Sequence, residues 1–299
     1  MNDHGKLLMT ILVTGATGTI GTQVVAQLRA RNVQFRALVR DPGKAKLPTG
    51  VDVVRGEFLD VDAMRAALKG VSTVFLLNAV VPDELTQALI ALNLAREAGV
   101  ERIVYLSVMN SDLYTNVPHF AGKYAVERMI ERLGLHATIL RPGYFMQNDL
   151  RLRDAIVAHG IYPMPIGDKG VAMVDVRDIG EVAAIELLRG ERGSGVLPLG
   201  RIDLAGPDFL TGSSIAAIWS EVSGRPVAYA GNDIDPFEQT MRSFAPNWMA
   251  YDMRMMIERF QKDGLSARPG DTQRLTAMLG RPLRSYGEFA SEMLDQSRE

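Results

Sequence analysis

His119 and Lys123 stand four residues apart in the stretch HFAGKYAVE, at the expected start of a helix. A spacing of four places both side chains on one face of a helix. A lysine is unfavourable there, because the positive end of the helix dipole repels its charge. An imidazole can exchange a proton near neutral pH, although a neighbouring ammonium favours its neutral form. The pair therefore marks this helix start as a candidate site of chemistry.

A glycine-rich stretch, TGATGTIG, forms a second candidate site over residues 14–21. It follows an apolar run predicted as a strand over 9–13 and opens a predicted helix, which is the context of a dinucleotide fingerprint. There Gly15 would allow the tight turn, Gly18 the approach of pyrophosphate, and Gly21 the close packing of helix on strand. The helix start would offer free N–H groups to phosphates. The other residues expected at the phosphates are Thr17, Thr19 and Ile20. The alternative is an ordinary glycine-rich turn.

Basic residues follow the second predicted strand, which covers 34–40. Folds that prefer NAD place an acid at this point, where it bonds the ribose 2′-hydroxyl. Here the strand ends in Arg40, and Lys44 and Lys46 follow. A guanidinium can bind a 2′-phosphate, so the sequence favours NADP, with a solvated basic turn as the alternative.

The composition excludes several classes of protein. Of the 299 residues, 47% are hydrophobic and 23% are charged, which is ordinary for a globular protein, and cysteine is absent. A formal net charge of −2 lacks the excess of Lys and Arg that a nucleic-acid surface needs. No apolar run approaches the roughly 20 residues of a membrane span. We expect a cytoplasmic protein without a metal site, because paired metal-ligand spacings, a P-loop and a G-x-S-x-G motif are missing.

Strand and helix patterns alternate through the first half of the chain, with apolar strands also predicted at 51–56, 72–78, 102–107 and 136–142. This alternation predicts an α/β fold, a doubly wound parallel sheet of Rossmann type with a smaller, mostly helical C-terminal lobe. The expected core covers 1–155, with 171–206 returning to it, and the expected substrate-binding lobe covers 156–170 and 207–299. Ligands bind such sheets at the carboxyl ends of the strands, where Asn78 and Ser107 lie. Each of these two could equally be a turn residue.

Several stretches in sequence order resemble one known family. They are ALVRDPGKA, GEFLD, HFAGKYAVERMIERLGLHATILRPGYFMQN, VAMVDVRDIGEVAA and LAGPDFLTGSSIAAIWSEVSGRPVAY. Together with the G-x-x-G-x-x-G spacing they resemble the NmrA-like family of the atypical short-chain dehydrogenase/reductase superfamily. The resemblance covers roughly residues 9–230.

The resemblance implies roles for further residues. Glu57 and Phe58 would line the adenine pocket, and Lys123 would bond the nicotinamide ribose. His119 stands where the superfamily commonly has a catalytic tyrosine, so it is either a proton donor or a packing residue. The segment expected beside the nicotinamide contains Pro142, Gly143, Tyr144 and Phe145, and the alternative is that its aromatic side chains belong to the core.

The function expected from these features is that of an NADPH-dependent oxidoreductase. Hydride would pass to a small electron-poor substrate such as a quinone, an enone or a dye, which needs no strong acid. The alternative is a non-catalytic NAD(P)-binding redox sensor of the NmrA type that regulates a partner. An isomerase is disfavoured because its chemistry relies on the tyrosine. A homodimer or a regulatory protein partner is left open.

Overall fold

The computed structural model describes residues 10–189 and 199–295, which form two compact units. The first unit holds the described residues up to Ser107, residues 122–141, and the described residues from Ile179 to Ile202. The second unit holds Val108–Ala121, Pro142–Asp178 and the described residues from Asp203 onward. These boundaries differ from the expected ones, because the chain leaves the sheet of the first unit after two of its strands and joins the second unit earlier than the sequence pattern indicates.

The first unit is built on a seven-stranded sheet with the order β10-β6-β5-β4-β1-β2-β3. The pairings β1–β2, β1–β4, β2–β3, β4–β5 and β5–β6 are all parallel, which confirms the doubly wound α/β fold. The strand order reverses between β1 and β4, so the ligand-binding switch point lies there. The strands are β1 Ile11–Val13, β2 Phe35–Val39, β3 Asp52–Arg55, β4 Thr73–Leu76, β5 Arg102–Leu106, β6 Ala137–Pro142 and β10 Gly200–Leu204.

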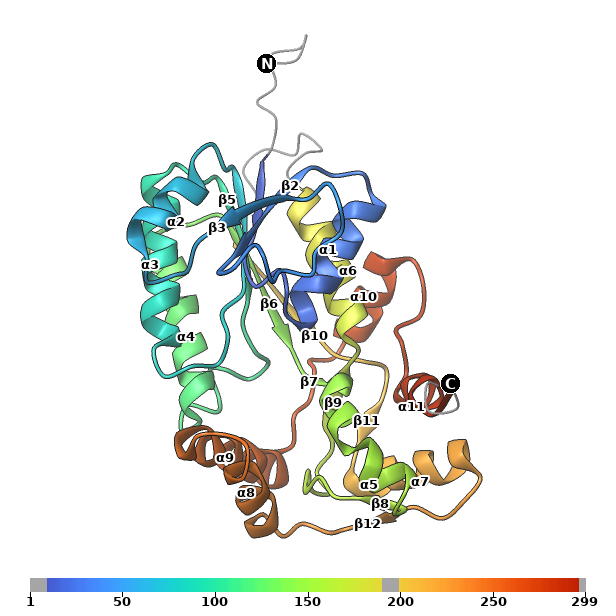
Figure 1. Cartoon of the computed structure of the whole chain (residues 1–299). Coiled ribbons are helices and arrows are strands. Elements are labelled where there is room, and N and C mark those ends of the chain that lie inside the picture. The colour runs from blue at the N-terminus through green and yellow to red at the C-terminus, as the bar shows by residue number, and fades with distance from the viewer. Residues whose placement is uncertain (1–9, 190–198, 296–299) are drawn as a thin grey trace. The chain divides into compact units, whose positions relative to one another are not determined.

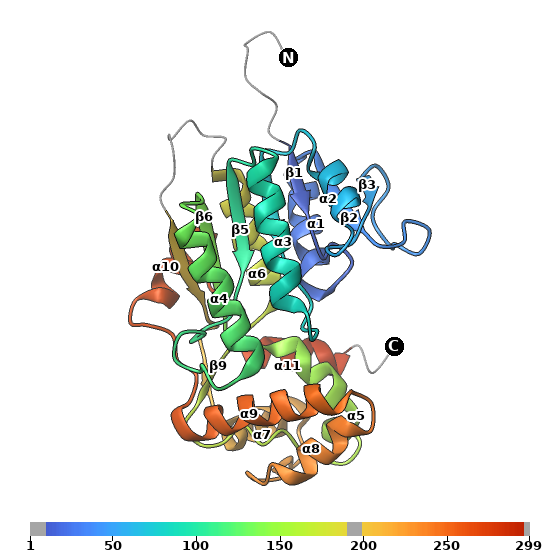
Figure 2. The same cartoon turned by 90° about the vertical axis from the view of Figure 1, so that its left-hand side faces the viewer.

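Helices cover both faces of this sheet (Figures 1 and 2). On one face lie α2, α3 and α4, and on the other lie α1 and α6. The apolar sides of α2, α3 and α4 and the sheet form a core that includes Leu12, Leu76, Tyr105 and Ile130. The helices are α1 Thr19–Ala30, α2 Val61–Leu68, α3 Glu84–Glu97, α4 Pro118–Arg132 and α6 Val176–Leu188.

The second unit combines helices with two small sheets. One sheet has the order β11-β9-β7 and the other pairs β12 with β8, while α8 packs against α9 and α7 against α11. Its strands are β7 Tyr144–Phe145, β8 Ile161–Tyr162, β9 Val171–Val174, β11 Phe209–Leu210 and β12 Ala228–Tyr229. Its helices are a 3₁₀ helix Met146–Leu152, α5 Arg153–Val157, α7 Gly212–Ser223, α8 Asp235–Arg242, α9 Asn247–Asp263, α10 Asp271–Leu279 and α11 Tyr286–Asp295.

A buried carboxyl group sits inside the second unit's core. Asp149 Oδ2 accepts hydrogen bonds from the hydroxyls of Tyr286 at 2.6 Å and Tyr162 at 3.2 Å. Trp219 in turn donates its indole N–H to the Tyr286 hydroxyl at 3.2 Å. Burial raises the pKa of Asp149 to about 7, although the two tyrosine hydrogen bonds oppose the shift.

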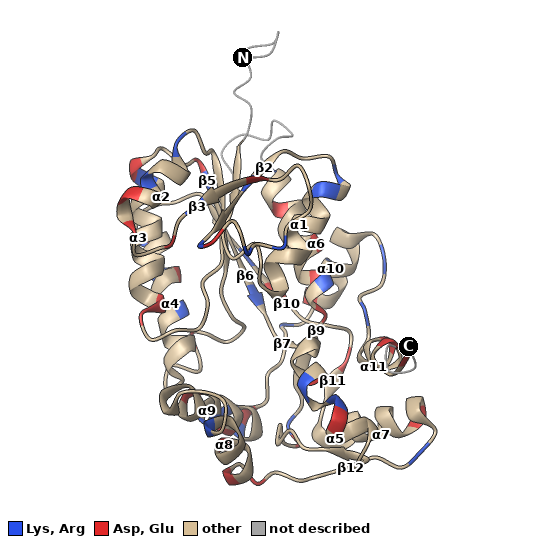
Figure 3. Ribbon diagram, viewed as in Figure 1, with Lys and Arg blue, Asp and Glu red and all other residues tan. Residues whose placement is uncertain are grey.

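The charged residues are interspersed rather than separated by sign, as Figure 3 shows for the ribbon of both units. None of the helices in the described ranges is long and apolar enough to cross a membrane.

A buried ion pair anchors α4 to the sheet. The Glu127 carboxylate on α4 accepts hydrogen bonds from Arg141 in β6, with Nε 2.9 Å from Oε1 and Nη2 2.5 Å from Oε2. The Ser107 hydroxyl, directly after β5, donates to Glu127 Oε1 at 2.5 Å. Both Glu127 and Arg141 are almost completely buried. The position of α4 therefore depends on one carboxylate that contacts two neighbouring strands.

We expect Glu127→Ala to lower the free energy of unfolding by about 3–5 kcal/mol, because it removes the carboxylate that faces the buried Arg141 charge. The matched control is Glu97→Ala, which removes an exposed ion pair with Arg65 at 3.3 Å and should cost less than about 1 kcal/mol. Urea denaturation of both variants measures the difference. Equal losses would contradict the anchoring role of Glu127.

Candidate functional site

The glycine-rich stretch forms a tight turn between β1 and α1. Gly15 has a φ of +63°, which favours glycine, and its carbonyl accepts a hydrogen bond from Gly18 N–H at 3.0 Å. A Cβ on Gly21 would lie 2.0 Å from the Gly15 oxygen, so only glycine lets α1 start this close to the turn. Gly15 thus occupies the turn position expected from the sequence, whereas Gly21 packs against the backbone of the turn at Gly15 and Ala16 rather than against a strand.

The start of α1 is open to a ligand. Gly18 is the N-cap and makes no side-chain capping hydrogen bond, so the first N–H groups of the helix lack an acceptor from a capping side chain. Thr17, Gly18 and Thr19 are exposed. Ile20 has a buried side chain, so only its backbone can contact a ligand. This end of α1 can accept an anion through backbone N–H groups and the helix dipole.

The basic loop after β2 begins with Arg40, whose guanidinium is available to bind a ligand. Arg40 is exposed and makes no hydrogen bond or ion pair with any described residue. Lys44 is different, because its Nζ lies 3.3 Å from Asp41 Oδ2. Arg40 is therefore better placed than Lys44 to bind an added phosphate group.

Asn78 lies two residues beyond β4, at the carboxyl edge of the sheet next to the switch point. Its side chain is buried, yet neither Nδ2 nor Oδ1 has a hydrogen-bond partner among the residues that the structure describes. An unpaired buried amide costs about 1–3 kcal/mol, which a bound polar ligand would offset. Ser107 differs, since its hydroxyl proton is already donated to Glu127.

Two further predicted residues follow β3 in the first unit. Glu57 is exposed, whereas Phe58 is half-buried and packs against the core on the α2–α3 face. The role of these two side chains at an adenine ring stays a prediction.

Lys123 has a partner that the sequence did not indicate. Its Nζ lies 2.6 Å from Oε1 of Glu84 in the first turn of α3, and both side chains are nearly buried. Helix α4 begins at Pro118, so Lys123 lies in the second turn, where the helix dipole has weakened. The Glu84 carboxylate rather than the helix position therefore determines the environment of the ammonium.

His119 also has an acidic partner, and both lie in the second unit. His119 Nδ1 lies 2.8 Å from Oδ2 of Asp252 on α9, and the His119 backbone N–H points to Asp252 Oδ1 at 3.4 Å. Asp252 is 2% exposed. Sequence reasoning missed this pair, because 133 residues separate its members and no local pattern joins them.

The segment after β6 also lies in the second unit. Gly143 N–H donates to the Leu204 carbonyl at 2.8 Å, and a Cβ there would lie 2.3 Å from the Ala172 oxygen. Burial and the nearby Asp149 charge raise the pKa of Tyr144 above its ordinary range, so its phenol stays protonated at neutral pH. The assignment of Pro142, Tyr144 and Phe145 to a cofactor remains a prediction, as does that of Ser107.

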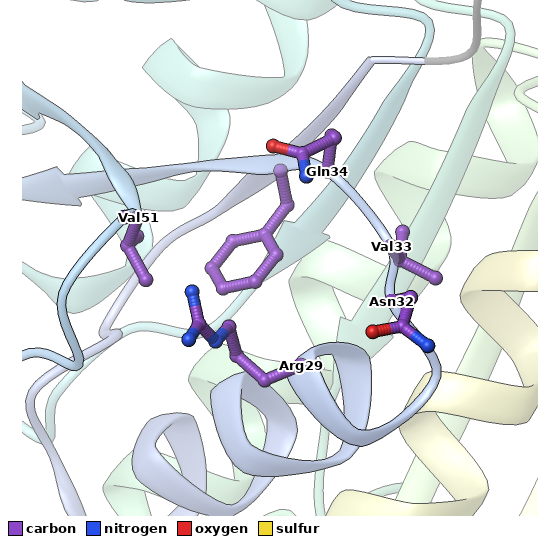
Figure 4. Close-up of a pocket in the computed structure, with 7 residues that line it drawn as sticks. Arg29, Asn32, Val33, Gln34 and Val51 are labelled. Carbon is purple, nitrogen blue, oxygen red and sulfur yellow. The ribbon is translucent and has the colours of Figure 1, made fainter.

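A separate hollow of about 200 Å³ lies at the opposite edge of the sheet. Figure 4 shows Arg29 and Asn32 from the end of α1 beside Gln34 and Val51. It opens where β2 starts, whereas the glycine turn, Arg40, Asn78 and Lys123 belong to segments at or beyond the carboxyl ends of strands. The first unit therefore brings most predicted cofactor residues to one edge, and the hollow lies away from it.

Known proteins match this chain over nearly its full length. The NAD(P)H azoreductase of Xenophilus azovorans is 32% identical over 285 residues, covering 94% of this chain and 96% of that protein. The (4-alkanoyl-5-oxo-2,5-dihydrofuran-3-yl)methyl phosphate reductase of Streptomyces griseus is 32% identical over 288 residues, covering 94% and 97%. The crystal structure of an Escherichia coli NADPH-dependent quinone oxidoreductase complexed with NADPH has a TM-score of 0.84 at 27% identity, covering 95% and 99%.

The NmrA-like family model matches residues 8–277, and the order of motifs in the sequence agrees with that match. The glycine turn, the parallel sheet and the near-complete coverage of reductase relatives all agree with this assignment. The chain belongs to the NmrA-like family.

Proposed function

We propose that this chain is an NADPH-dependent oxidoreductase that transfers hydride to a small, electron-poor substrate. The observation that carries the proposal is the open glycine turn at the switch point, in a chain that is similar over nearly its full length to an NAD(P)H azoreductase. The names of the relatives point to an azo bond, an unsaturated lactone and a quinone. These groups share a conjugated, electron-poor double bond that accepts hydride.

The first unit fits a dinucleotide. The start of α1 offers N–H donors, and the buried Asn78 amide lacks partners among the described residues, as expected for a group that bonds a ligand. Arg40 would hold the 2′-phosphate, and Lys123, oriented by Glu84, would donate to the nicotinamide ribose. When bound, NADPH supplies the hydride. The other residues proposed to hold it are Gly15, Thr17, Gly18, Thr19, Ile20, Gly21, Lys44, Glu57 and Phe58.

The proposal predicts catalytic turnover. The purified protein should oxidise NADPH, followed by the fall in absorbance at about 340 nm, with at least one substrate from a panel of quinones, enones and azo dyes. Protein without substrate and substrate without protein are the controls. NADPH binding without turnover across the panel would contradict the proposal and favour a redox sensor.

Arg40→Ala should weaken NADPH binding by about 10–100-fold and leave NADH binding nearly unchanged, because only NADPH carries the 2′-phosphate and a charge-assisted hydrogen bond contributes about 1.5–3 kcal/mol. Isothermal titration with both cofactors measures this. Arg29→Ala, at the opposite edge of the sheet, is the matched control. Similar losses for both cofactors would argue against the 2′-phosphate assignment.

Substitutions of Gly18 and Gly21 should distinguish an effect on NADPH binding from an effect on the stability of the fold. A Cβ on Gly18 meets the Gly15 oxygen at 3.4 Å, an ordinary contact, whereas on Gly21 it clashes. Gly18→Ala should therefore keep the melting temperature of the cofactor-free protein but weaken NADPH binding, because the methyl group occupies the approach of the pyrophosphate. Gly21→Ala should lower the melting temperature, since overpacking costs about 1–3 kcal/mol. Thermal unfolding with and without NADPH tests both, and unchanged NADPH binding by Gly18→Ala would be the contrary result.

A further inference from the structure

We propose that Asp252 is a positioning residue that sets the tautomer of His119, so that His119 Nε2 delivers a proton to substrates that need one together with hydride. The inference rests on the proposed function and extends it to a residue of α9. It concerns two side chains of the second unit that contact each other directly.

The environment of Asp252 makes its carboxylate a hydrogen-bond acceptor. A buried carboxylate needs donors, and His119 supplies two, its ring at 2.8 Å and its backbone N–H at 3.4 Å. The second donor belongs to the first turn of α4, where N–H groups lack intrahelical acceptors and the helix dipole favours negative charge. An anionic acceptor at Oδ2 requires a proton on Nδ1.

The remaining ring nitrogen, Nε2, is available for chemistry. Within the described part of the chain it makes no hydrogen bond. The ring is held by Asp252 and packs against Phe120 in a T-shaped arrangement, with the two ring centroids 4.7 Å apart. On continuous helix α4, His119 lies one turn before Lys123 on the same face, and Glu84 already neutralises that ammonium. The backbone of α4 therefore separates the two residues by about one helical turn.

The chemistry of the substrate decides whether this proton is required. Hydride addition to an azo bond leaves negative charge on the second nitrogen, which takes the Nε2 proton of the imidazolium. The neutral imidazole keeps its proton on Nδ1, facing Asp252, and water returns the lost proton. A cationic triphenylmethane dye is different, because hydride addition to its central carbon gives a neutral product directly. Removal of the proton donor should therefore slow reduction of the azo bond and leave the rate of reduction of the cationic dye unchanged.

The tautomer can be measured without cofactor. The chain has four histidines, so His119→Gln assigns the His119 signals in a long-range ¹H–¹⁵N spectrum. We expect the neutral His119 ring to carry its proton on Nδ1 in the wild-type protein and to shift toward Nε2–H in Asp252→Asn. The same tautomer in both proteins would overturn the positioning role.

Steady-state kinetics test the proton transfer. With the azo dye methyl red, Asp252→Asn and His119→Gln should each lower kcat by about 10²-fold, the lower end of general acid catalysis, with little change in KM. With the cationic dye malachite green, both variants should keep kcat within about twofold of wild type, which also shows that they are folded. The matched control is Glu258→Gln, which replaces an exposed acid on α9 that pairs with Arg254. It should leave kcat unchanged with both dyes.

The outcomes separate the two proposals. Equal losses with both dyes, or no loss with methyl red, would overturn the proton-transfer role. A wild-type protein that reduces neither dye, nor any quinone or enone of the panel, would contradict the proposed function, and the spectra would then decide by themselves whether Asp252 positions His119.

Discussion

The buried carboxylate of Glu127 fixes the helix on which the proposed chemistry depends. It contacts Arg141 in β6 and Ser107 after β5, so it ties α4 to two adjacent strands. A buried ion pair is weak evidence for stability, because desolvation offsets most of its attraction. Its geometric effect is clearer, since any shift of α4 along the sheet would break these hydrogen bonds. The register of α4 in turn sets where Lys123 lies relative to the strand ends.

Each basic side chain that the sequence singled out on α4 has a buried acid as its partner. Glu84 binds Lys123, and Asp252 binds His119. A lysine is tolerated near this helix start because it lies in the second turn of α4 and because the Glu84 carboxylate offsets its charge. The acids also limit the rotamers of both side chains, which is what orientation of a ligand requires.

The missing tyrosine has a chemical meaning within this arrangement. Relatives of this chain act, by their names, on an azo bond, an unsaturated lactone and a quinone. Such groups accept hydride because they are conjugated and electron-poor, so the need for a strong acid is smaller than for a simple ketone. His119, held by the Asp252 carboxylate, is the proton donor that we propose in place of that tyrosine.

The sequence by itself determined the parallel α/β fold and the glycine turn, because strand and helix periodicity and the conformational freedom of glycine are local properties. It also identified Arg40, Asn78 and Lys123 as candidates from their places at strand and helix ends, although their contacts with a cofactor stay predictions. Only the tertiary structure decided that the Ser107 hydroxyl donates to Glu127 and that the Asn78 amide is buried without a partner among the described residues. It also decided that Glu84 pairs with Lys123 and Asp252 with His119. These contacts join residues 20 to 133 positions apart, and packing rather than any local pattern brings them together.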